Sequence, residues 1–279
     1  WRSRTQTPAL GRSAAVEAGM SQRDTKRTEA HIALLIDADN SPATKIDVIL
    51  TELSTYGVTN VRRAYGNWKK SELKGWEEKL HEHAIRPMQQ FDYSKGKNAS
   101  DMAMVIDALE LLYTDHPDAF GIVSSDADFT PLVMHLRAKG AAVYGFGAQK
   151  TPEPFVNACS RFLYLDKLLA PSTAELSDAV EDQVPAAPLR VPTAQLKQDT
   201  RLVALLRNAV QASADESGWA RVGSVGQQIG NQASFDPRNY GYATLTKLLV
   251  ATQLFDMAHE GTSQVTVRDK RTAKASRAG

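Results

Sequence analysis

A run of five apolar residues, Ile32-Ala33-Leu34-Leu35-Ile36, stops abruptly at the acidic sequence Asp37-Ala38-Asp39. The run shows no alternation of polar and apolar residues, which is typical of a strand buried on both faces of a parallel sheet. Further strand candidates, in chain order, lie at 58–65, 84–91, 121–123 and 141–146. Helical stretches separate them, near 44–56, 71–83, 99–113 and 129–138. This alternation predicts an α/β fold, a parallel-sheet α/β/α sandwich.

The periodicity changes near residue 170, which divides the chain into two predicted domains joined by a linker. Residues 30–169 form the α/β domain. Residues 170–198 are rich in Pro, Ala, Ser and Thr and carry an acidic patch, which is typical of a semi-extended tether. Helical periodicity returns over 199–268, where three helices and a short hairpin predict a second, small winged-helix (α+β) domain. The tether predicts that the two domains move semi-independently.

The formal net charge of +1 conceals an uneven distribution of charge along the chain. Residues 1–29, predicted to be a disordered tail, carry six Lys/Arg and three Asp/Glu, whereas residues 268–279 carry five against one. The stretch 30–267 is therefore mildly acidic. Basic tails, here 1–29 and 269–279, attract polyanions without sequence preference, although charged tails also serve solubility alone.

Composition excludes several classes of protein. No apolar run approaches the ~20 residues that span a bilayer, so a membrane-spanning protein is not expected. A single cysteine, Cys159, can form neither an intrachain disulfide nor a cysteine-based zinc site, and we expect a cytoplasmic location. The Arg-rich N-terminal stretch lacks the continuous apolar core of a secretory signal. Because the sequence opens with Trp1, we take Met20 as a candidate start, with residues 1–19 upstream of it.

Acidic residues gather where the predicted strands end. The acids that directly follow the strands at 32–36 and 121–123 are Asp37, Asp39, Asp126 and Asp128. A further acid, Asp101, opens the helix predicted from residue 99, with Ser100 as its candidate N-cap. Because chemistry in an open parallel sheet collects at the carboxyl ends of the strands, we expect these carboxylates to converge.

Converging carboxylates repel one another unless a cation or protons neutralise them. Hard oxygen ligands suit Mg²⁺ or Mn²⁺, and such a metal orients a water, lowers its pKa and stabilises charge on a phosphoryl group. A simpler interpretation is that each Asp caps the helix that follows it. Capping is sufficient for one such residue, but it explains the combination of Asp37, Asp126 and Asp128 less well.

Three motifs give the first domain a family resemblance. They are Leu35-Ile36-Asp37-Ala38-Asp39-Asn40, Lys97-Asn98-Ala99-Ser100-Asp101, and Val123-Ser124-Ser125-Asp126-Ala127-Asp128-Phe129 with Pro131-Leu132. In order and spacing they resemble the NYN domain, a member of the PIN-like superfamily of metal-dependent ribonucleases, over about 31–168. The resemblance implies a PIN-like sheet and metal ligands at Asp37, Asp101, Asp126 and Asp128.

The same resemblance implies further roles near these acids. The Asn40 side chain would orient the substrate or a metal-bound water, which completes the predicted catalytic set. The position of Asp39 varies in the family pattern. Asp107 lies six residues after Asp101, or ~600° around a helix, so we expect its side chain to point away from the site. Family membership would make the chain a Mg²⁺- or Mn²⁺-dependent ribonuclease that uses water as nucleophile and leaves 5′-phosphate ends.

Two other interpretations stay open. The pattern Asp37-x-Asp39 after an apolar strand also fits the haloacid-dehalogenase phosphatases. That motif usually continues to Thr or Val, where this chain has Asn40, and no convincing lysine of the third phosphatase motif lies between the acid clusters. The second alternative, from another functional class, is a non-catalytic RNA-binding or regulatory scaffold protein whose acidic site is vestigial.

Basic residues near the acids are candidates for RNA contact. Lys95 and Lys97 lie in the loop before Asp101, well placed to meet phosphates. Between 62 and 70, four basic residues are interleaved with Tyr65 and Trp68, a pattern that suits single-stranded nucleic acid as well as a solvated face. The sequence His81-Glu82-His83 is interpreted as surface, because side chains at i and i+2 point about 200° apart on a helix.

The C-terminal module shows a resemblance of its own. Its marks are Gly218-Trp219-Ala220, Val225, Phe235-Asp236-Pro237-Arg238-Asn239-Tyr240-Gly241-Tyr242, Leu245 and Leu248-Leu249. These resemble the OST-HTH domain, also called LOTUS, over about 199–268. The resemblance implies an RNA partner, single-stranded or structured, with a protein partner as the alternative. The candidate RNA contacts are Arg238, Asn239, Tyr240 and Lys247, whereas Trp219 and Phe235 are expected in the core.

Overall fold

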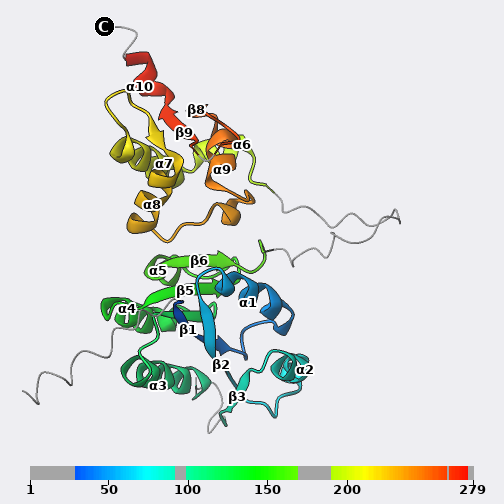
Figure 1. The fold of residues 1–279 in the computed structure, drawn as a ribbon. Helices are drawn as coiled ribbons and strands as arrows, with labels where there is room; N and C mark the ends of the chain where they lie inside the picture. The colour runs from blue at the N-terminus through cyan, green and yellow to red at the C-terminus, as the bar shows by residue number, and fades with distance from the viewer. Residues whose placement is uncertain (1–28, 92–98, 169–189, 263, 276–279) are drawn as a thin grey trace, which may run out of the picture.

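The computed structural model describes residues 29–91, 99–168, 190–262 and 264–275. They form a larger α/β domain and a smaller, mainly helical domain that meet along one side (Figure 1). Within this part of the chain, no helix combines the length and apolar character that crossing a membrane requires.

Six parallel strands form the central sheet of the first domain, in the order β3-β2-β1-β4-β5-β6. The strands are β1 (His31–Asp37), β2 (Val58–Gly66), β3 (Arg86–Gln89), β4 (Ala119–Val123), β5 (Ala142–Gly147) and β6 (Arg161–Tyr164). Helices α1 (Ile46–Ser54) and α2 (Lys74–Glu82) cover one face of the sheet, and α3 (Ala99–Thr114), α4 (Thr130–Ala138) and α5 (Glu153–Ala158) cover the other (Figure 1). The predicted α/β fold with a parallel sheet is confirmed.

Strand β1 shows why its sequence is wholly apolar. Ile32, Leu34 and Ile36 pack into the core on the α1 side, and Ala33 and Leu35 pack into the core on the α3 side. All five side chains are essentially inaccessible to solvent. A strand in the middle of a sheet covered on both faces has no position for a polar residue until it ends.

Strand β6 and helix α5 were not predicted from the sequence. The strand has four residues, lies at the edge of the sheet, and has half-buried polar side chains, Arg161 and Tyr164, at its two ends. Edge strands that are this short carry little apolar signal. The helix has six residues and begins after Pro152, which is too short for a periodic pattern to appear.

The second domain packs helices around a three-stranded antiparallel sheet of order β7-β9-β8. Its elements are α6 (Thr193–Gln198), α7 (Thr200–Ser213), β7 (Ala220–Arg221), α8 (Val222–Gln232), the 3-10 helix η5 (Pro237–Tyr240), α9 (Leu245–Thr252), β8 (Phe255–Ala258), β9 (Thr266–Asp269) and α10 (Lys270–Ala275). Core residues include Leu202, Leu206, Ile229, Leu248 and Val267. The predicted small helical domain with a short hairpin is confirmed.

Two sequence expectations for this domain differ from the structure. Helix α6 lies inside the predicted linker, yet its Leu196 is fully buried in the core of the second domain, so this core starts before residue 199. Trp219 and Phe235, expected in the core, are only partly buried. Trp219 lies beneath the guanidinium of Arg268, 4.6 Å from its ring centre, and Phe235 packs against the rim of the core.

Candidate active site

Strands β1 and β4 are neighbours in parallel register, with Ile36 opposite Val123. The chain therefore leaves the carboxyl ends of these two strands side by side, at one edge of the sheet. We call the five aspartates that follow at or near this edge the acid edge: Asp37, Asp39, Asp101, Asp126 and Asp128.

Asp37 is the most buried member of the acid edge, with 1% of its surface exposed. The Ser124 hydroxyl donates a hydrogen bond to Asp37 Oδ2 at 2.9 Å, and Asn40 Nδ2 lies 3.0 and 3.3 Å from the two carboxylate oxygens. Burial raises the pKa of Asp37 above its ordinary value, whereas the hydrogen bonds from Asn40 and Ser124 lower it. Asp37 and Asn40, each predicted separately as a site residue, are thus in contact with one another.

Asp126 and Asp128 lie in the turn after β4. The Asp126 carboxylate accepts a hydrogen bond from the Asp128 backbone at 2.8 Å, and the Asp126 backbone donates to the Ser124 hydroxyl at 3.1 Å. Asp126 is the N-cap of a short 3-10 helix, Ala127–Phe129, so the capping interpretation is correct for this residue. Asp128 is exposed. Capping fixes the Asp126 carboxylate in one orientation at the edge of the sheet.

Asp101 stands in the first turn of α3 and is half-buried. Burial raises its pKa to about 6, and the charges of Asp37, Asp126, Asp39 and Asp128 add to the shift in that order. The structure therefore brings the predicted aspartates close enough to repel one another.

Asp39 is held by groups that the sequence analysis did not assign to it. Ser100 donates its hydroxyl to Asp39 Oδ2 at 3.1 Å, and Lys70 Nζ lies 3.3 Å from Oδ1. Ser100 lies inside α3, and its hydroxyl donates to the Asp39 carboxylate rather than capping the helix. Because Asp39 and Lys70 meet only through folding of two separate loops, no local pattern could have indicated this pair.

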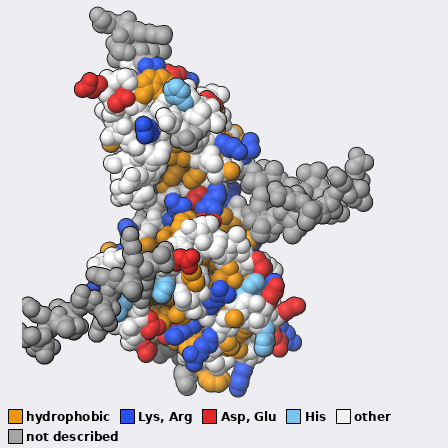
Figure 2. Space-filling model, in the orientation of Figure 1, with side chains coloured by type: hydrophobic (Ala, Val, Ile, Leu, Met, Phe, Trp, Pro, Cys, Tyr) orange, Lys and Arg blue, Asp and Glu red, His pale blue; other side chains and the backbone are white. Residues whose placement is uncertain are grey.

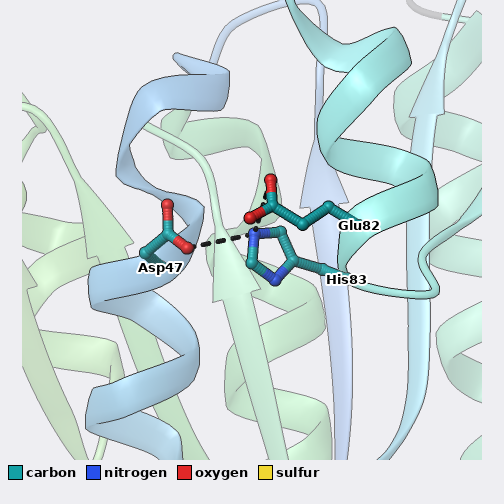
Figure 3. Close-up of side chains that lie close together, drawn as sticks. All are labelled: Asp47, Glu82 and His83. Atoms are coloured by element: carbon teal, nitrogen blue, oxygen red, sulfur yellow. Dashed lines mark ion pairs between the residues drawn. The ribbon is translucent and has the colours of Figure 1, made fainter.

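A tighter group of ligand types lies elsewhere in the first domain. Within the described ranges, one set of three ligand atoms falls within 4.8 Å of one another, and it comes from Asp47, Glu82 and His83 (Figure 3). His83 Nε2 is 3.1 Å from Asp47 and 3.8 Å from Glu82, but Lys79 Nζ is 3.4 Å from Asp47 and 2.7 Å from Glu82. The lysine already forms ion pairs with both carboxylates, so we interpret this group as an ion-pair cluster between α1 and α2.

The carboxylates of the acid edge do not reach that separation in groups of three. Lys95 and Lys97, the predicted phosphate contacts, lie outside the described residues. Asp107 points away from the acid edge, as expected, and contacts Arg63 and the Tyr65 hydroxyl on β2.

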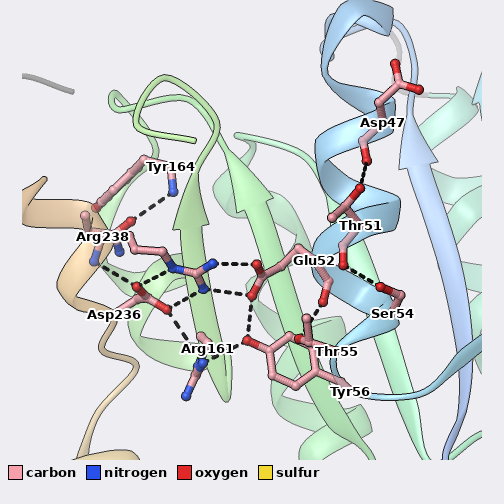
Figure 4. A network of polar contacts seen from close by, with 11 residues as sticks. Asp47, Thr51, Glu52, Ser54, Thr55, Tyr56, Arg161, Tyr164, Asp236 and Arg238 are labelled. Atoms are coloured by element: carbon pink, nitrogen blue, oxygen red, sulfur yellow. Dashed lines mark hydrogen bonds and ion pairs between the residues drawn. The ribbon is translucent and has the colours of Figure 1, made fainter. Parts of the chain in front are cut away.

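Two predicted RNA contacts of the second domain lie against the first domain instead. Arg238 forms hydrogen bonds with Glu52 on α1 (Figure 4), and Asn239 bonds with the backbone of β6. Their side chains are thus engaged within the chain, and RNA contact by them stays a prediction without support from this arrangement. Tyr240 is partly buried, and burial raises its pKa to about 12. Lys247 is exposed on α9.

A six-stranded parallel sheet with aspartates from three segments at its carboxyl edge defines a PIN-like α/β domain. Comparison with protein families agrees, since residues 31–166 match the NYN domain and residues 196–267 match the OST-HTH/LOTUS domain. The chain carries an NYN domain, of the PIN-like nuclease superfamily, followed by an OST-HTH/LOTUS domain.

Individual relatives are more distant. The chain is 30% identical over 128 residues to the uncharacterized protein MJ0482 of Methanocaldococcus jannaschii, which covers 44% of this chain and 50% of that protein. It thus spans about half the length of this curated relative.

Two solved structures show limited likeness. VPA0982 of Vibrio parahaemolyticus, described as a protein of unknown function, matches with TM-score 0.41 and 19% identity, over 49% of this chain and 93% of that one. An uncharacterized protein from locus NE0665 of Nitrosomonas europaea matches with TM-score 0.21 and 25% identity, over 37% and 88%. Neither is close enough to bear on function.

Proposed function

We propose that the chain is a ribonuclease that hydrolyses RNA phosphodiester bonds with Mg²⁺ or Mn²⁺ at the acid edge, and that its OST-HTH domain captures RNA. One observation carries this proposal. The acid edge collects aspartates from three separate segments, and the pKa of one of them, Asp101, is raised first by burial and then by the charges of the other four. So much like charge in one place favours a cation there.

The donors fit a hard divalent cation because all of them are carboxylate oxygens. We assign Asp37, Asp101, Asp126 and Asp128 as the residues that would hold it. When bound, Mg²⁺ or Mn²⁺ would lower the pKa of a water and stabilise charge on the phosphoryl group.

The chain's own residues supply orientation. Ser124 and Asn40 donate hydrogen bonds that hold the Asp37 carboxylate in one position, and the Asp128 amide does the same for Asp126. Asn40 would also position the attacking water or a phosphate oxygen. Water then displaces the 3′ oxygen of the scissile bond, so the downstream product carries a 5′-phosphate and no covalent enzyme intermediate forms.

The loops after β2 and β3 provide a surface suited to single-stranded RNA. Phe91 is 45% exposed, and Lys69 Nζ lies 5.0 Å from the centre of its ring. An exposed aromatic ring beside a cation can stack a base and neutralise the adjoining phosphate. Lys70, next in the chain, contacts Asp39, which places this surface beside the acid edge. The exposed Lys247 is our remaining candidate for RNA contact in the OST-HTH domain.

A non-catalytic RNA-binding scaffold is the second candidate function. It is favoured by the OST-HTH/LOTUS match, which supports RNA binding without reference to the acid edge. Calorimetric titration with Mn²⁺ separates the two functions. A site tighter than millimolar that is lost in D37N supports the ribonuclease, and the absence of such a site supports the scaffold.

Cleavage of defined single-stranded and structured RNAs in Mn²⁺ tests the ribonuclease directly. We expect D126N to lower turnover by ~100-fold or more, because a lost metal ligand removes several kcal/mol of transition-state stabilisation. The matched control is D115N, an exposed aspartate beyond the far end of α3, which should keep wild-type turnover. If the wild-type chain cleaves no RNA while it and D126N bind RNA equally, the ribonuclease proposal fails.

A further inference from the structure

The guanidinium of Arg238 connects the two domains through paired hydrogen bonds. Its two terminal nitrogens donate to Glu52 Oε2 and Oε1 at 2.5 and 2.7 Å (Figure 4). Its Nε and one terminal nitrogen also donate to Asp236, two residues earlier, at 2.9 and 2.8 Å. Asp236 therefore orients the Arg238 guanidinium from within the OST-HTH domain. The terminal nitrogens of that guanidinium then face Glu52 on α1. Such bidentate pairs are the geometrically most specific kind of ion pair.

Both carboxylates of this network are buried, with 7% of Glu52 and 2% of Asp236 exposed. Burial by itself would raise the pKa of Glu52, but hydrogen bonds from Arg238 and Tyr56 outweigh it and lower the pKa below its ordinary value. A buried carboxylate is costly unless it is paired and hydrogen-bonded. Glu52 belongs to the NYN domain and Arg238 to the OST-HTH domain, so the guanidinium that compensates for the burial of Glu52 comes from across the boundary.

A second layer of residues supports the pair. Tyr56 donates its hydroxyl to Glu52 at 2.6 Å, and Arg161 at the start of β6 donates to the same hydroxyl at 2.8 Å. Arg161 also lies 3.6 Å from Asp236 across the boundary. Glu52 is thus contacted by Arg238 and the Tyr56 hydroxyl, and Asp236 by Arg238 and Arg161. Each carboxylate of the network therefore has a partner in both domains. Lys and Arg side chains gather visibly where the two domains meet (Figure 2).

The neighbouring Asn239 satisfies the edge of the NYN sheet. Its Nδ2 donates to the Phe162 carbonyl at 2.9 Å, and its Oδ1 accepts from the Tyr164 amide at 3.2 Å. Strand β6 is an edge strand, whose outer backbone groups have no partner strand. The side-chain amide of Asn239 bonds with β6 as one residue of a neighbouring strand would. These two hydrogen bonds fix the position of η5 along β6.

A cavity of about 370 Å³ lies beside the network, lined in part by Val48, Leu168, Tyr242 and Ala243. The paired hydrogen bonds of Arg238 are the geometrically specific contacts at this boundary. The domains also belong to one chain, so docking is intramolecular. At an effective concentration of ~1 mM, an interface with an intrinsic Kd of ~10 µM would be closed ~99% of the time.

We propose that the segment 236–239 is a docking element that holds the OST-HTH domain on α1 and β6 of the NYN domain, so that the two domains form one unit. This replaces the semi-independent movement predicted from the linker composition. It also assigns Arg238 and Asn239 to the NYN domain as their partner rather than to RNA. The inference stands apart from the proposed ribonuclease activity, because it concerns how the domains are held together.

Pulsed electron spin distance measurement on the full chain tests the docking. Spin labels at E78C on α2 and Q211C on α7 report the separation of the domains, since both positions are exposed. The native Cys159 is 1% exposed and burial raises its thiol pKa to about 12, so it should stay unlabelled. We expect one narrow distance distribution. R238A should broaden it and lower the ratio of docked to undocked chains at least tenfold, because Glu52 is left buried without its partner.

Three further variants make the test specific. E52A removes the same pair from the other domain and should match R238A, so a folding defect in one domain cannot account for both results. N239A should also broaden the distribution. R201A is the matched control, because Arg201 and Glu153 form another interdomain ion pair, at 2.5 Å, whose side chains are 78% and 68% exposed. A broad distribution in the wild-type chain, or an effect of R201A equal to that of R238A, would overturn the proposal.

Discussion

Asp101 shows at the scale of one residue what the acid edge does electrostatically. Its pKa is raised to about 6, first by burial and then by Asp37 and Asp126. A carboxyl group whose pKa in the folded protein exceeds its ordinary 3.8 stabilises the fold fully below pH ~4. That contribution is lost as the pH rises through about 6.

We therefore expect D101N to remove a pH dependence of stability from the metal-free protein. A difference of two pKa units corresponds to ~3 kcal/mol, and solvent screening of this half-exposed group reduces it to ~1 kcal/mol. Denaturant unfolding in the presence of a chelator, at pH 4.5 and 7.5, measures it. The free energy of unfolding of the wild-type chain, relative to D101N, should fall between the two pH values. An equal pH dependence in both proteins would contradict the account.

The sequence could predict which aspartates meet, because strands that end at one edge of a parallel sheet carry their following residues there. The meeting of Asp37 and Asp126 could be predicted from this rule together with the apolar runs that precede them. The contacts of Asp39 with Ser100 and Lys70 could not be predicted in the same way. They depend on the path of two loops, and loop paths are set by packing rather than by local pattern.

At the scale of one element, helix α3 carries Asp101 in its first turn and is held to the sheet by a residue near its middle. Asp107, 9% exposed and six residues after Asp101, contacts both Arg63 and the Tyr65 hydroxyl on β2. The contact with Asp107 raises the pKa of Arg63, against the effect of burial, which lowers it. Asp107 thus fastens α3 to β2, and we expect it to act as a positioning residue for Asp101 through the helix.

We expect D107N to destabilise the protein by ~2–3 kcal/mol, because it leaves a largely buried arginine without its counter-charge. Y65F, which removes one neutral donor, should cost ~1 kcal/mol. Thermal or denaturant unfolding measures both. With RNA as substrate, D107N should lower kcat more than it changes KM, since Asp101 moves with the helix. A D107N protein as stable as wild type would show that the contact does not anchor α3.

Elements were predictable in proportion to their length and burial. The helix predicted at 99–113 is observed as Ala99–Thr114, and that predicted at 129–138 as Thr130–Ala138. Strand β6 escaped prediction because it has four residues at a sheet edge. Yet β6 is where the second domain docks, through Asn239. Interfaces of this kind use the short, mixed-polarity elements that sequence periodicity does not reveal.

In the whole molecule, the OST-HTH domain lies against α1 and β6. Within the described part of the chain, its hydrogen bonds and ion pairs with the NYN domain are made by residues outside the acid edge. The pair Glu52–Arg238 joins residues 186 positions apart in the chain. The sequence marked Arg238 only as part of the Phe235–Tyr242 motif, and a glutamate in a helix, such as Glu52, gives no sign of its partner. The linker composition alone therefore led to a prediction of semi-independent domains.

Truncation after Ala170 tests how the domains share the work. Because the acid edge lies within the NYN domain, the shortened chain should keep its turnover on saturating short RNA. It should lose apparent affinity for long or structured RNA by ~10-fold or more, since the OST-HTH domain no longer raises the local RNA concentration. Steady-state kinetics on short and long RNAs measure both effects. Loss of turnover on short RNA at saturation would instead mean that the OST-HTH domain completes the active site.

The central claim is that the acid edge binds the catalytic metal. Anomalous diffraction from crystals of the full chain soaked in Mn²⁺ locates the ion without reference to activity. The account predicts a peak bounded by the carboxylates of Asp37, Asp101, Asp126 and Asp128, which draw together around it. No peak at the acid edge, or a peak only at the Asp47–Glu82–His83 cluster, would contradict it.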